Sequence, residues 1–111
     1  MPCKLSRGLL NFVKPLKKLS EKYPELILLD VGDTIQDDPS SFYFSHFASE
    51  TTRPLPVIEM FNWLKYEALT LGNYDFETPT NILNQNITLA KYNWLAANVS
   101  FRKVKHPLFL A

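Results

Sequence analysis

Two short polar stretches carry the side chains best suited to chemistry in this sequence. They read Gly32-Asp33-Thr34-Ile35 and Gly72-Asn73-Tyr74-Asp75, and each follows a short apolar run. Asp33 and Asn73 offer side-chain oxygen atoms, which hard and borderline divalent metals favour as ligands. A carboxylate can bridge two metal ions, and such a pair can hold a phosphate group and activate water. The spacing alone leaves open that both stretches are only turns after strands.

Apolar runs predict the strands that position these stretches. The runs are continuous rather than alternating, which is typical of parallel strands covered on both faces, and they lie near 26–31, 67–71 and 94–99. The first two runs end directly before Gly32 and Gly72. Because ligands bind beyond the carboxyl ends of parallel strands, Asp33 and Asn73 are expected at the ligand-binding edge of one sheet.

Helical periodicity fills the segments between the strands. A first helix is predicted from Leu9 to Leu19, with Pro15 either kinking it or starting it again. A second is expected over about 54–65 with Thr52 as its cap, and Thr78-Pro79 opens a third. The resulting α-β-α-β-α-β order predicts an α/β fold.

Two segments show no clear period. The stretch from Thr34 to Arg53 is predicted to be a long loop, and the tail from Ser100 to Ala111 is predicted to be irregular, with a short apolar end.

Length and composition exclude several classes of protein. The chain has 111 residues, and 12 basic and 11 acidic residues give a net charge of 12 − 11 = +1, which argues against a nucleic-acid polymer as partner. A hydrophobic content of 46% excludes a disordered chain. Cys3 is the single cysteine, so no internal disulfide is expected. No apolar run suits a membrane span or a signal peptide, so the chain as written is expected in the cytoplasm.

Several strings together resemble the calcineurin-like metallophosphoesterases, and within them the 5′-nucleotidase and 2′,3′-cyclic-nucleotide 2′-phosphodiesterase family. The resemblance runs from about Arg7 to Val99 and rests on four strings in order, which are LLDVGDTIQ at 28–36, PVIEMFN at 56–62, LTLGNYDF at 69–76 and ANV at 97–99. It implies metal-dependent hydrolysis of a nucleotide or other phosphoester, with two divalent ions such as Mn, Zn or Mg.

The resemblance also implies a role for each matched residue. Asp33 stands where the family's aspartate bridges both metals, and Asn73 stands where an asparagine binds the second metal. Tyr74 replaces a histidine that contacts the scissile phosphate. Asp75 matches the acidic residue after that histidine, and Glu77 stands where an Asp or Asn often occurs, so both are expected behind the metal ligands. The sequence indicates no substrate-binding residues.

Departures from the family pattern predict an incomplete site. A neutral phenol at position 74 removes a positioned donor, a change that costs on the order of 10²–10³ in rate. The family's Asp-x-His motif is expected before Leu9 and its Gly-His-x-His pair beyond Ala111, while His46 and His106 fit neither. Residues 1–111 are therefore expected to form an incomplete N-terminal part of the catalytic domain, without its first strand and C-terminal half.

Glycines of the family pattern are replaced at two places, by Asp37 and by Thr78-Pro79. Glycine adopts a positive φ without strain and proline cannot adopt it. These changes therefore favour the interpretation that selection on the catalytic function is relaxed.

Three interpretations follow from these patterns. The chain is a fragment of a nucleotide phosphoesterase that is inactive alone, or a non-catalytic remnant, or a binding module that associates with another chain. Under the first interpretation, a partner chain or missing segments of the same gene would complete the catalytic site. Relatives of this kind are often exported. Two weaker signals are glycosylation patterns at Asn86 and Asn98, and an aromatic cluster at 42–47 that favours packing over base binding.

Overall fold

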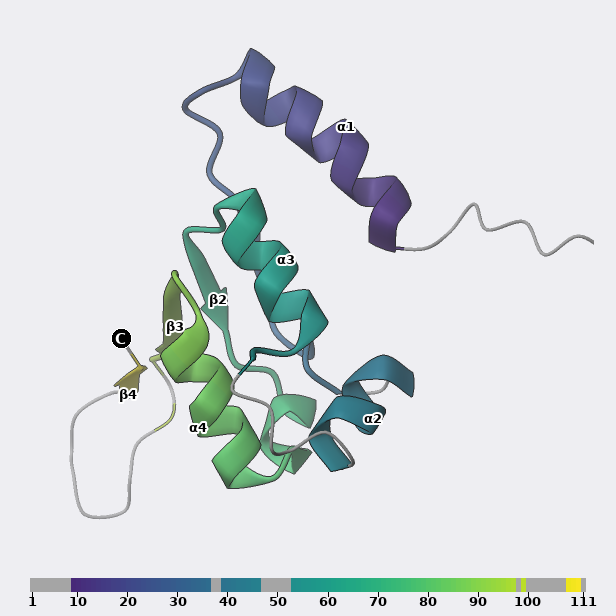
Figure 1. Cartoon of the computed structure of the whole chain (residues 1–111). Coiled ribbons are helices and arrows are strands. Elements are labelled where there is room, and N and C mark those ends of the chain that lie inside the picture. Colours follow the sequence, from purple (N-terminus) through teal and green to yellow (C-terminus); the bar gives the residue numbers. More distant parts are fainter. Residues whose placement is uncertain (1–8, 37–38, 47–52, 98, 100–107, 111) are drawn as a thin grey trace, which may run out of the picture.

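A computed structural model describes residues 9–36, 39–46, 53–97, 99 and 108–110 of the chain (Figure 1). The elements follow one another as α1 (Leu9–Lys22), β1 (Leu29–Asp30), α2 (Pro39–His46), α3 (Pro56–Leu64), β2 (Ala68–Thr70), the 3₁₀ helix η1 (Tyr74–Glu77), α4 (Thr80–Leu89), β3 (Asn93–Ala96) and β4 (Leu108–Leu110). None of the described helices is long and apolar enough to cross a membrane.

The sheet has the order β1-β2-β3-β4. Its first three strands are parallel, with Leu29 beside Ala68 and Leu69 beside Trp94, which confirms the predicted parallel α/β arrangement. The first two predicted strands extend beyond β1 and β2 at both ends, whereas β3 begins one residue before the third predicted strand and ends three residues earlier. The prediction of an irregular tail was wrong at its end, because β4 pairs antiparallel to β3 with Leu95 beside Phe109.

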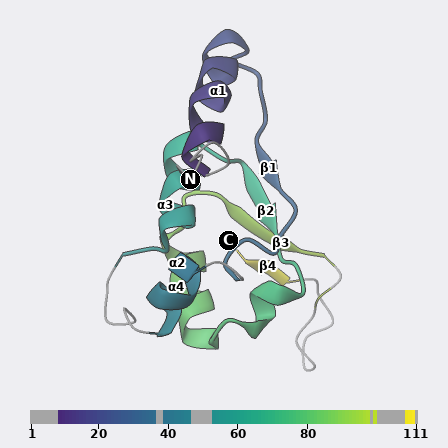
Figure 2. The same ribbon diagram turned by 90° about the vertical axis from the view of Figure 1, so that its right-hand side faces the viewer.

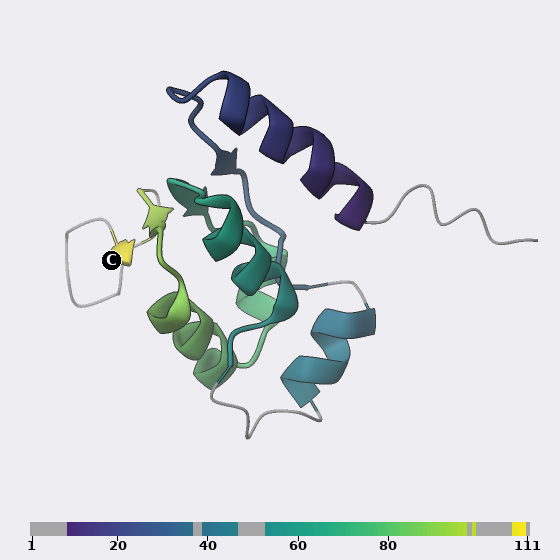
Figure 3. The ribbon, with the colours of Figure 1, turned by 45° about the horizontal axis from the view of Figure 1, so that its top comes forward.

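The core lies between this sheet and the helices α3 and α4, which cover the same face in Figures 2 and 3. Side chains from both layers meet there, and the largest fully buried ones include Trp94, Ile35, Ile58 and Leu69. The remaining members of the buried apolar cluster are Leu55, Phe61, Leu83 and Tyr92. Phe61 also stacks on Tyr66, with ring centroids 4.0 Å apart.

Two asparagines join the helices that cover the sheet. The Asn86 side chain accepts a hydrogen bond from the Leu55 backbone N–H (2.8 Å) and donates one to the Ile82 carbonyl (2.8 Å). The Asn62 side chain, near the C-terminal end of α3, donates to the carbonyl of Leu89, the last residue of α4 (3.0 Å). The helix pair is therefore fixed by polar contacts as well as by apolar burial.

Several helix predictions need correction. Pro15 lies inside the single helix α1, so the alternative in which a helix starts again at Pro15 is wrong, while the kink stays a prediction. Helix α3 begins after Leu55, which stands at its N-cap, with Pro56 in its first turn; the predicted cap Thr52 lies outside the described residues. Helix α2 occupies part of the predicted loop.

The first predicted strand is also placed differently from the expectation. Continuous apolar runs usually mark strands covered on both faces, but β1 is at one end of the sheet and the side chains of Ile27, Leu29 and Val31 are exposed. The described part of the chain contains nothing that covers them.

Candidate functional site

One buried carboxylate joins the two loops that follow β1 and β2. Asp75 is 0% exposed and accepts hydrogen bonds from four backbone N–H groups. Its Oδ2 receives those of Asp33 and Gly72, both at 2.9 Å, and its Oδ1 receives those of Thr34 (3.0 Å) and Ile35 (3.1 Å). Four N–H donors compensate the loss of solvent around this carboxylate. Asp75 therefore fixes the loop of Asp33 against the loop of Asn73.

Glycine is required where these two loops touch. A Cβ atom on Gly72 would lie 2.1 Å from Asp33 Oδ1, and a Cβ atom on Gly32 would lie 2.3 Å from the Gly72 backbone nitrogen. Gly32 also has φ +94°, which favours glycine, and Asp33 takes φ 59°. The pair of glycines thus lets the two loops approach more closely than any side chain would permit.

The predicted ligand Asp33 lies against the start of η1. Its Oδ1 accepts a hydrogen bond from the Tyr74 backbone N–H at 2.9 Å, so the carboxylate is directed to the turn that carries Asn73. Asp33 and Asn73 are both exposed at the carboxyl ends of neighbouring strands. The structure brings these two residues to one edge of the sheet, as ligands of a shared site require.

The remaining predicted site residues have different environments. The Tyr74 side chain is exposed and lies next to Asn73, whereas Glu77 is exposed at the end of η1. Asp75 was predicted to lie behind the expected metal ligands, but the sequence did not reveal that it is the common acceptor for both loops. The Gly-Asp and Gly-Asn pairs marked both loops as turns after strands, but they gave no sign of an acceptor shared by the two loops.

A second carboxylate stabilises the same turn from the strand side. Asp30 Oδ1 accepts hydrogen bonds from the Gly32 backbone N–H (2.9 Å) and from the Thr34 hydroxyl. Burial raises the pKa of Tyr66 above its usual 10.0, and the negative charge of Asp30 raises it further. The pKa of Tyr92 is raised by the same two causes in the same order and by its neighbour Tyr66. The sequence patterns did not single out Asp30.

The donor atoms fit a divalent cation in type but not in number. Asp33 and Asn73 supply a carboxylate and an amide oxygen, which suit hard and borderline metals. Within the described residues, however, no three His, Cys, Asp or Glu side chains come together as a metal-binding group. Among the described residues, Asp33 and Asn73 could therefore supply only part of the ligand set that a dinuclear centre needs.

The structure also bears on the replaced glycine near Pro79 and on the glycosylation pattern at Asn86. Pro79 takes φ −50° and precedes α4, so that position does not need the positive φ that glycine supplies. Asn86 is buried and bonded on both sides of its amide, so the folded protein does not present it for glycosylation. Asp37, Asn98 and His106 lie outside the described residues.

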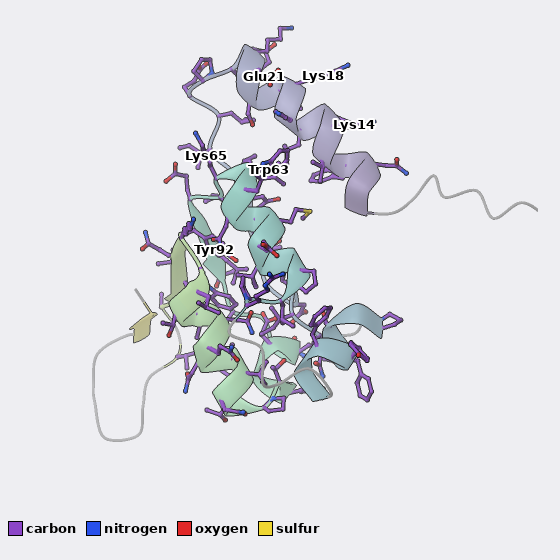
Figure 4. The ribbon with its side chains drawn as sticks, viewed as in Figure 1. Lys14, Lys18, Glu21, Trp63, Lys65 and Tyr92 are labelled. Carbon is purple, nitrogen blue, oxygen red and sulfur yellow. The ribbon has the colours of Figure 1, made fainter. Side chains whose placement is uncertain are left out.

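A groove at the opposite end of the sheet is not part of this site. It has a volume of about 410 Å³ and lies between the end of α1, residues 23–28 and the end of α3. The Lys17 ammonium lies 5.1 Å from the centre of the exposed Trp63 ring there. Figure 4 shows Trp63 and Lys65 at the end of α3 that faces Glu21 of α1. Leu28 and Glu67 in its lining precede β1 and β2, so the groove is at the amino ends of the strands.

Comparison with known proteins places the fold and the site in context. No protein-family model matches the chain. The trifunctional nucleotide phosphoesterase protein YfkN of Bacillus subtilis is 33% identical over 96 residues, which are 83% of this chain and 7% of YfkN. The 2′,3′-cyclic-nucleotide 2′-phosphodiesterase/3′-nucleotidase of Haemophilus influenzae is 32% identical over 83 residues, which are 75% of this chain and 13% of that protein.

A solved structure gives the same result for the fold. The crystal structure of the calcineurin-like phosphoesterase YfkN from Bacillus subtilis superposes with a TM-score of 0.80 at 28% identity and covers 94% of this chain. The match includes 33% of that solved chain. This chain thus spans a third of the solved structure and a smaller part of the curated relatives it matches.

Proposed function

Since the chain's homologues and structural neighbours are calcineurin-like phosphoesterases of the 5′-nucleotidase and 2′,3′-cyclic-nucleotide phosphodiesterase family, we propose that it is the part of such a domain that contributes Asp33 and Asn73 to a metal centre acting on nucleotide phosphoesters. The relatives are nucleotide phosphoesterases that the chain matches over a small part of their length, as expected for a fragment of a metallophosphoesterase domain.

The observation that supports this proposal most strongly is the contact between the two loops that follow β1 and β2. Asp75 and the contact of Gly32 with Gly72 hold Asp33 beside the turn of Asn73, and both of these side chains are left exposed. A rigid pair of exposed oxygen donors is the arrangement that a metal site needs. The metal ions, when bound, would supply Lewis-acid chemistry to a phosphoester.

Tyr74 limits what the site can do. Its phenol is neutral near pH 7 and donates a single hydrogen bond, so it cannot offer positive charge to a phosphate as a protonated histidine can. The side chain is exposed beside Asn73 and has room for a different substituent. We expect a histidine at this position to raise the rate of an assembled site by on the order of 10²–10³.

The activity of the chain alone provides the first test. We expect no Mn²⁺-dependent hydrolysis of bis-p-nitrophenyl phosphate above background, because two oxygen donors do not make a dinuclear centre. Tyr74→His in the same isolated chain should gain nothing. Turnover by the isolated chain that is abolished by Asp33→Ala would overturn the view that the site needs ligands from elsewhere.

A chimera tests the proposed ligands directly. The matched third of the solved YfkN chain is replaced by this chain, so that the rest of the relative surrounds Asp33 and Asn73. Asp33→Ala and Asn73→Ala should each lower Mn²⁺ binding, measured by calorimetry. Glu59→Gln, on the exposed side of α3, is the matched control and should leave Mn²⁺ binding unchanged.

A further inference from the structure

The turn after β1 contains two neighbouring residues with positive φ, a backbone conformation that residues other than glycine rarely adopt. Gly32 has φ +94° and Asp33 has φ 59°. Among the described residues the other non-glycine case is Lys65, which ends α3 at a C-cap where this conformation is common. Asp33 ends no helix. A residue in the left-handed region stays there only where its surroundings hold it, and such residues cluster at functional sites.

Asp30 holds the chain on both sides of Asp33. Its Oδ1 accepts hydrogen bonds from the backbone N–H of Gly32, at 2.9 Å, and from the hydroxyl of Thr34. An aspartate that binds the N–H two positions further along is common in tight turns. Here the second bond extends the contact past Asp33, so a single oxygen atom fixes both the residue before Asp33 and the residue after it.

The place of Asp30 in the sheet favours a role in this turn over a role in stability. Asp30 is half-buried at the end of β1 and is in register with Leu69, which is fully buried beneath the helices. Burial raises the pKa of Tyr66 and of Tyr92 on this side of the sheet, and the charge of Asp30 raises both further. An apolar side chain would be buried here without the cost of desolvating a charge. The bonds to the turn therefore account for the carboxylate.

Asp30 and Asp75 act on the same turn in different ways. Asp75 joins the two loops through four backbone N–H groups. Within the described part of the chain, Asp30 bonds to the loop after β1 alone. The Asp33 carboxylate reaches the second loop through the Tyr74 N–H, at 2.9 Å. Loss of Asp30 would let Asp33 leave the left-handed conformation and break its bond to Tyr74, while Asp75 still joins the loops.

We infer that Asp30 is a positioning residue for Asp33. By holding Gly32 and Thr34, it keeps Asp33 in the left-handed conformation that directs its carboxylate to the turn of Asn73. The consequence for a metal centre rests on the proposed function, which makes Asp33 and Asn73 ligands. The direction of the Asp33 carboxylate is a property of the turn and can be measured without a metal.

The Tyr74 amide reports that direction, because it donates to Asp33 Oδ1. Its hydrogen exchange is followed by NMR in the metal-free chimera, together with that of the Gly72 amide, which donates to Asp75. Asp30→Ala should speed exchange at Tyr74 by about tenfold, the loss of one hydrogen bond to a carboxylate, and leave Gly72 unchanged. A general loss of stability would speed both amides alike, and that result would overturn the inference.

Conservative variants separate the acceptor from the charge. Both donors use the same oxygen of Asp30, so the amide oxygen of Asp30→Asn can accept both bonds. Exchange at Tyr74 should then match that of the parent, and exchange as fast as in Asp30→Ala would overturn the inference. Thr34→Val removes one of the two bonds and serves where Asp30→Ala does not fold. It should speed exchange at Tyr74, whereas Thr34→Ser should not, and an unchanged rate in Thr34→Val would count against the inference.

Mn²⁺ binding by the chimera tests the consequence for the metal centre. Asp30→Ala should lower the Mn²⁺ affinity by about 10-fold or more, as loss of a partner behind metal ligands does. Asn86→Ala is the matched control, because it removes a buried hydrogen bond between the helices and should leave the affinity unchanged. Parent-like affinity in Asp30→Ala, where Asp33→Ala is impaired, would refute the role of Asp30 alone. Parent-like affinity in Asp33→Ala would refute the proposed ligands, and the Tyr74 amide would still decide the role of Asp30.

Discussion

Replacing Asp75 by asparagine should remove half of the hydrogen bonds that hold the two loops of the candidate site together. The carboxylate accepts four backbone N–H groups, two on each oxygen. An amide of the same shape keeps one oxygen and turns an NH₂ group toward the other two donors. Two hydrogen bonds to a charged acceptor are then lost, at about 1.5–3 kcal/mol each, so we expect a loss of about 3–6 kcal/mol. This is a large part of the roughly 5–15 kcal/mol that stabilises a small domain.

Urea unfolding measures that loss. Trp94 is fully buried and reports on the core, and a Trp63→Phe background removes the signal of the exposed indole. With a slope of about 2 kcal/mol per molar urea, a loss of 4 kcal/mol lowers the midpoint by about 2 M.

Glu77→Gln is the matched control for Asp75→Asn. It removes one negative charge from the same 3₁₀ helix, but the side chain is exposed, so its effect should stay within about 0.5 kcal/mol. If the two variants unfold at the same urea concentration, Asp75 does not hold the two loops together, and the account of the site is refuted.

Three further substitutions test other parts of the structure. Gly72→Ala should cost about 1–3 kcal/mol in thermal unfolding, because its Cβ would lie 2.1 Å from Asp33 Oδ1. Asn86→Ala should cost about 2–3 kcal/mol in urea, because the Leu55 N–H loses its acceptor inside the protein. Tyr92→Phe should leave the free energy of unfolding unchanged or raise it by about 1 kcal/mol, because the buried Tyr92 hydroxyl has no hydrogen-bond partner among the described residues. Burial raises the pKa of Tyr92, so above pH 10 the folded chain keeps the phenol proton that the unfolded chain releases. The free energy of unfolding, measured by urea titrations at increasing pH, should therefore fall above pH 10. The fall should be less steep in Tyr92→Phe.

Specific outcomes would contradict these three expectations. Gly72→Ala with unchanged stability would mean that the two loops do not touch. Asn86→Ala should exceed Asn84→Ala, an exposed change in the same helix, and equal losses would rule out the role of the buried amide. A marked loss of stability in Tyr92→Phe at pH 7 would mean that the hydroxyl has a partner.

The alternation of helix and strand and the position of the candidate site could be predicted from the sequence. Continuous apolar runs require a buried parallel sheet, and polar residues directly after two of them must meet at one edge. Asp33 and Asn73 were placed there on this ground. The contact of Gly32 with Gly72 was not predictable, since the approach of two loops depends on tertiary packing.

Other features depended on long-range pairing. The run 26–31 indicates a covered strand, yet β1 is at the end of the sheet and its apolar side chains are exposed. Its composition suits a neighbour that is not among the described residues. Short strands such as β4 form through pairing with β3 and carry little signal of their own. Asp75 matches the acidic residue that the family pattern has after position 74. Its four hydrogen-bond donors, however, come from residues 33–35 and 72, up to 42 positions away in the sequence.

Mn²⁺ binding by the chimera decides whether this chain contributes ligands to a metal centre. With the rest of the relative in place, Asp33→Ala and Asn73→Ala should each reduce the amount or affinity of bound Mn²⁺, while Glu59→Gln should not, and circular dichroism should show all three variants folded. This readout does not depend on turnover, which the proposed role of Tyr74 would limit. Folded Asp33→Ala and Asn73→Ala chimeras that bind Mn²⁺ as the parent does would contradict the claim that this chain contributes ligands to a metal centre.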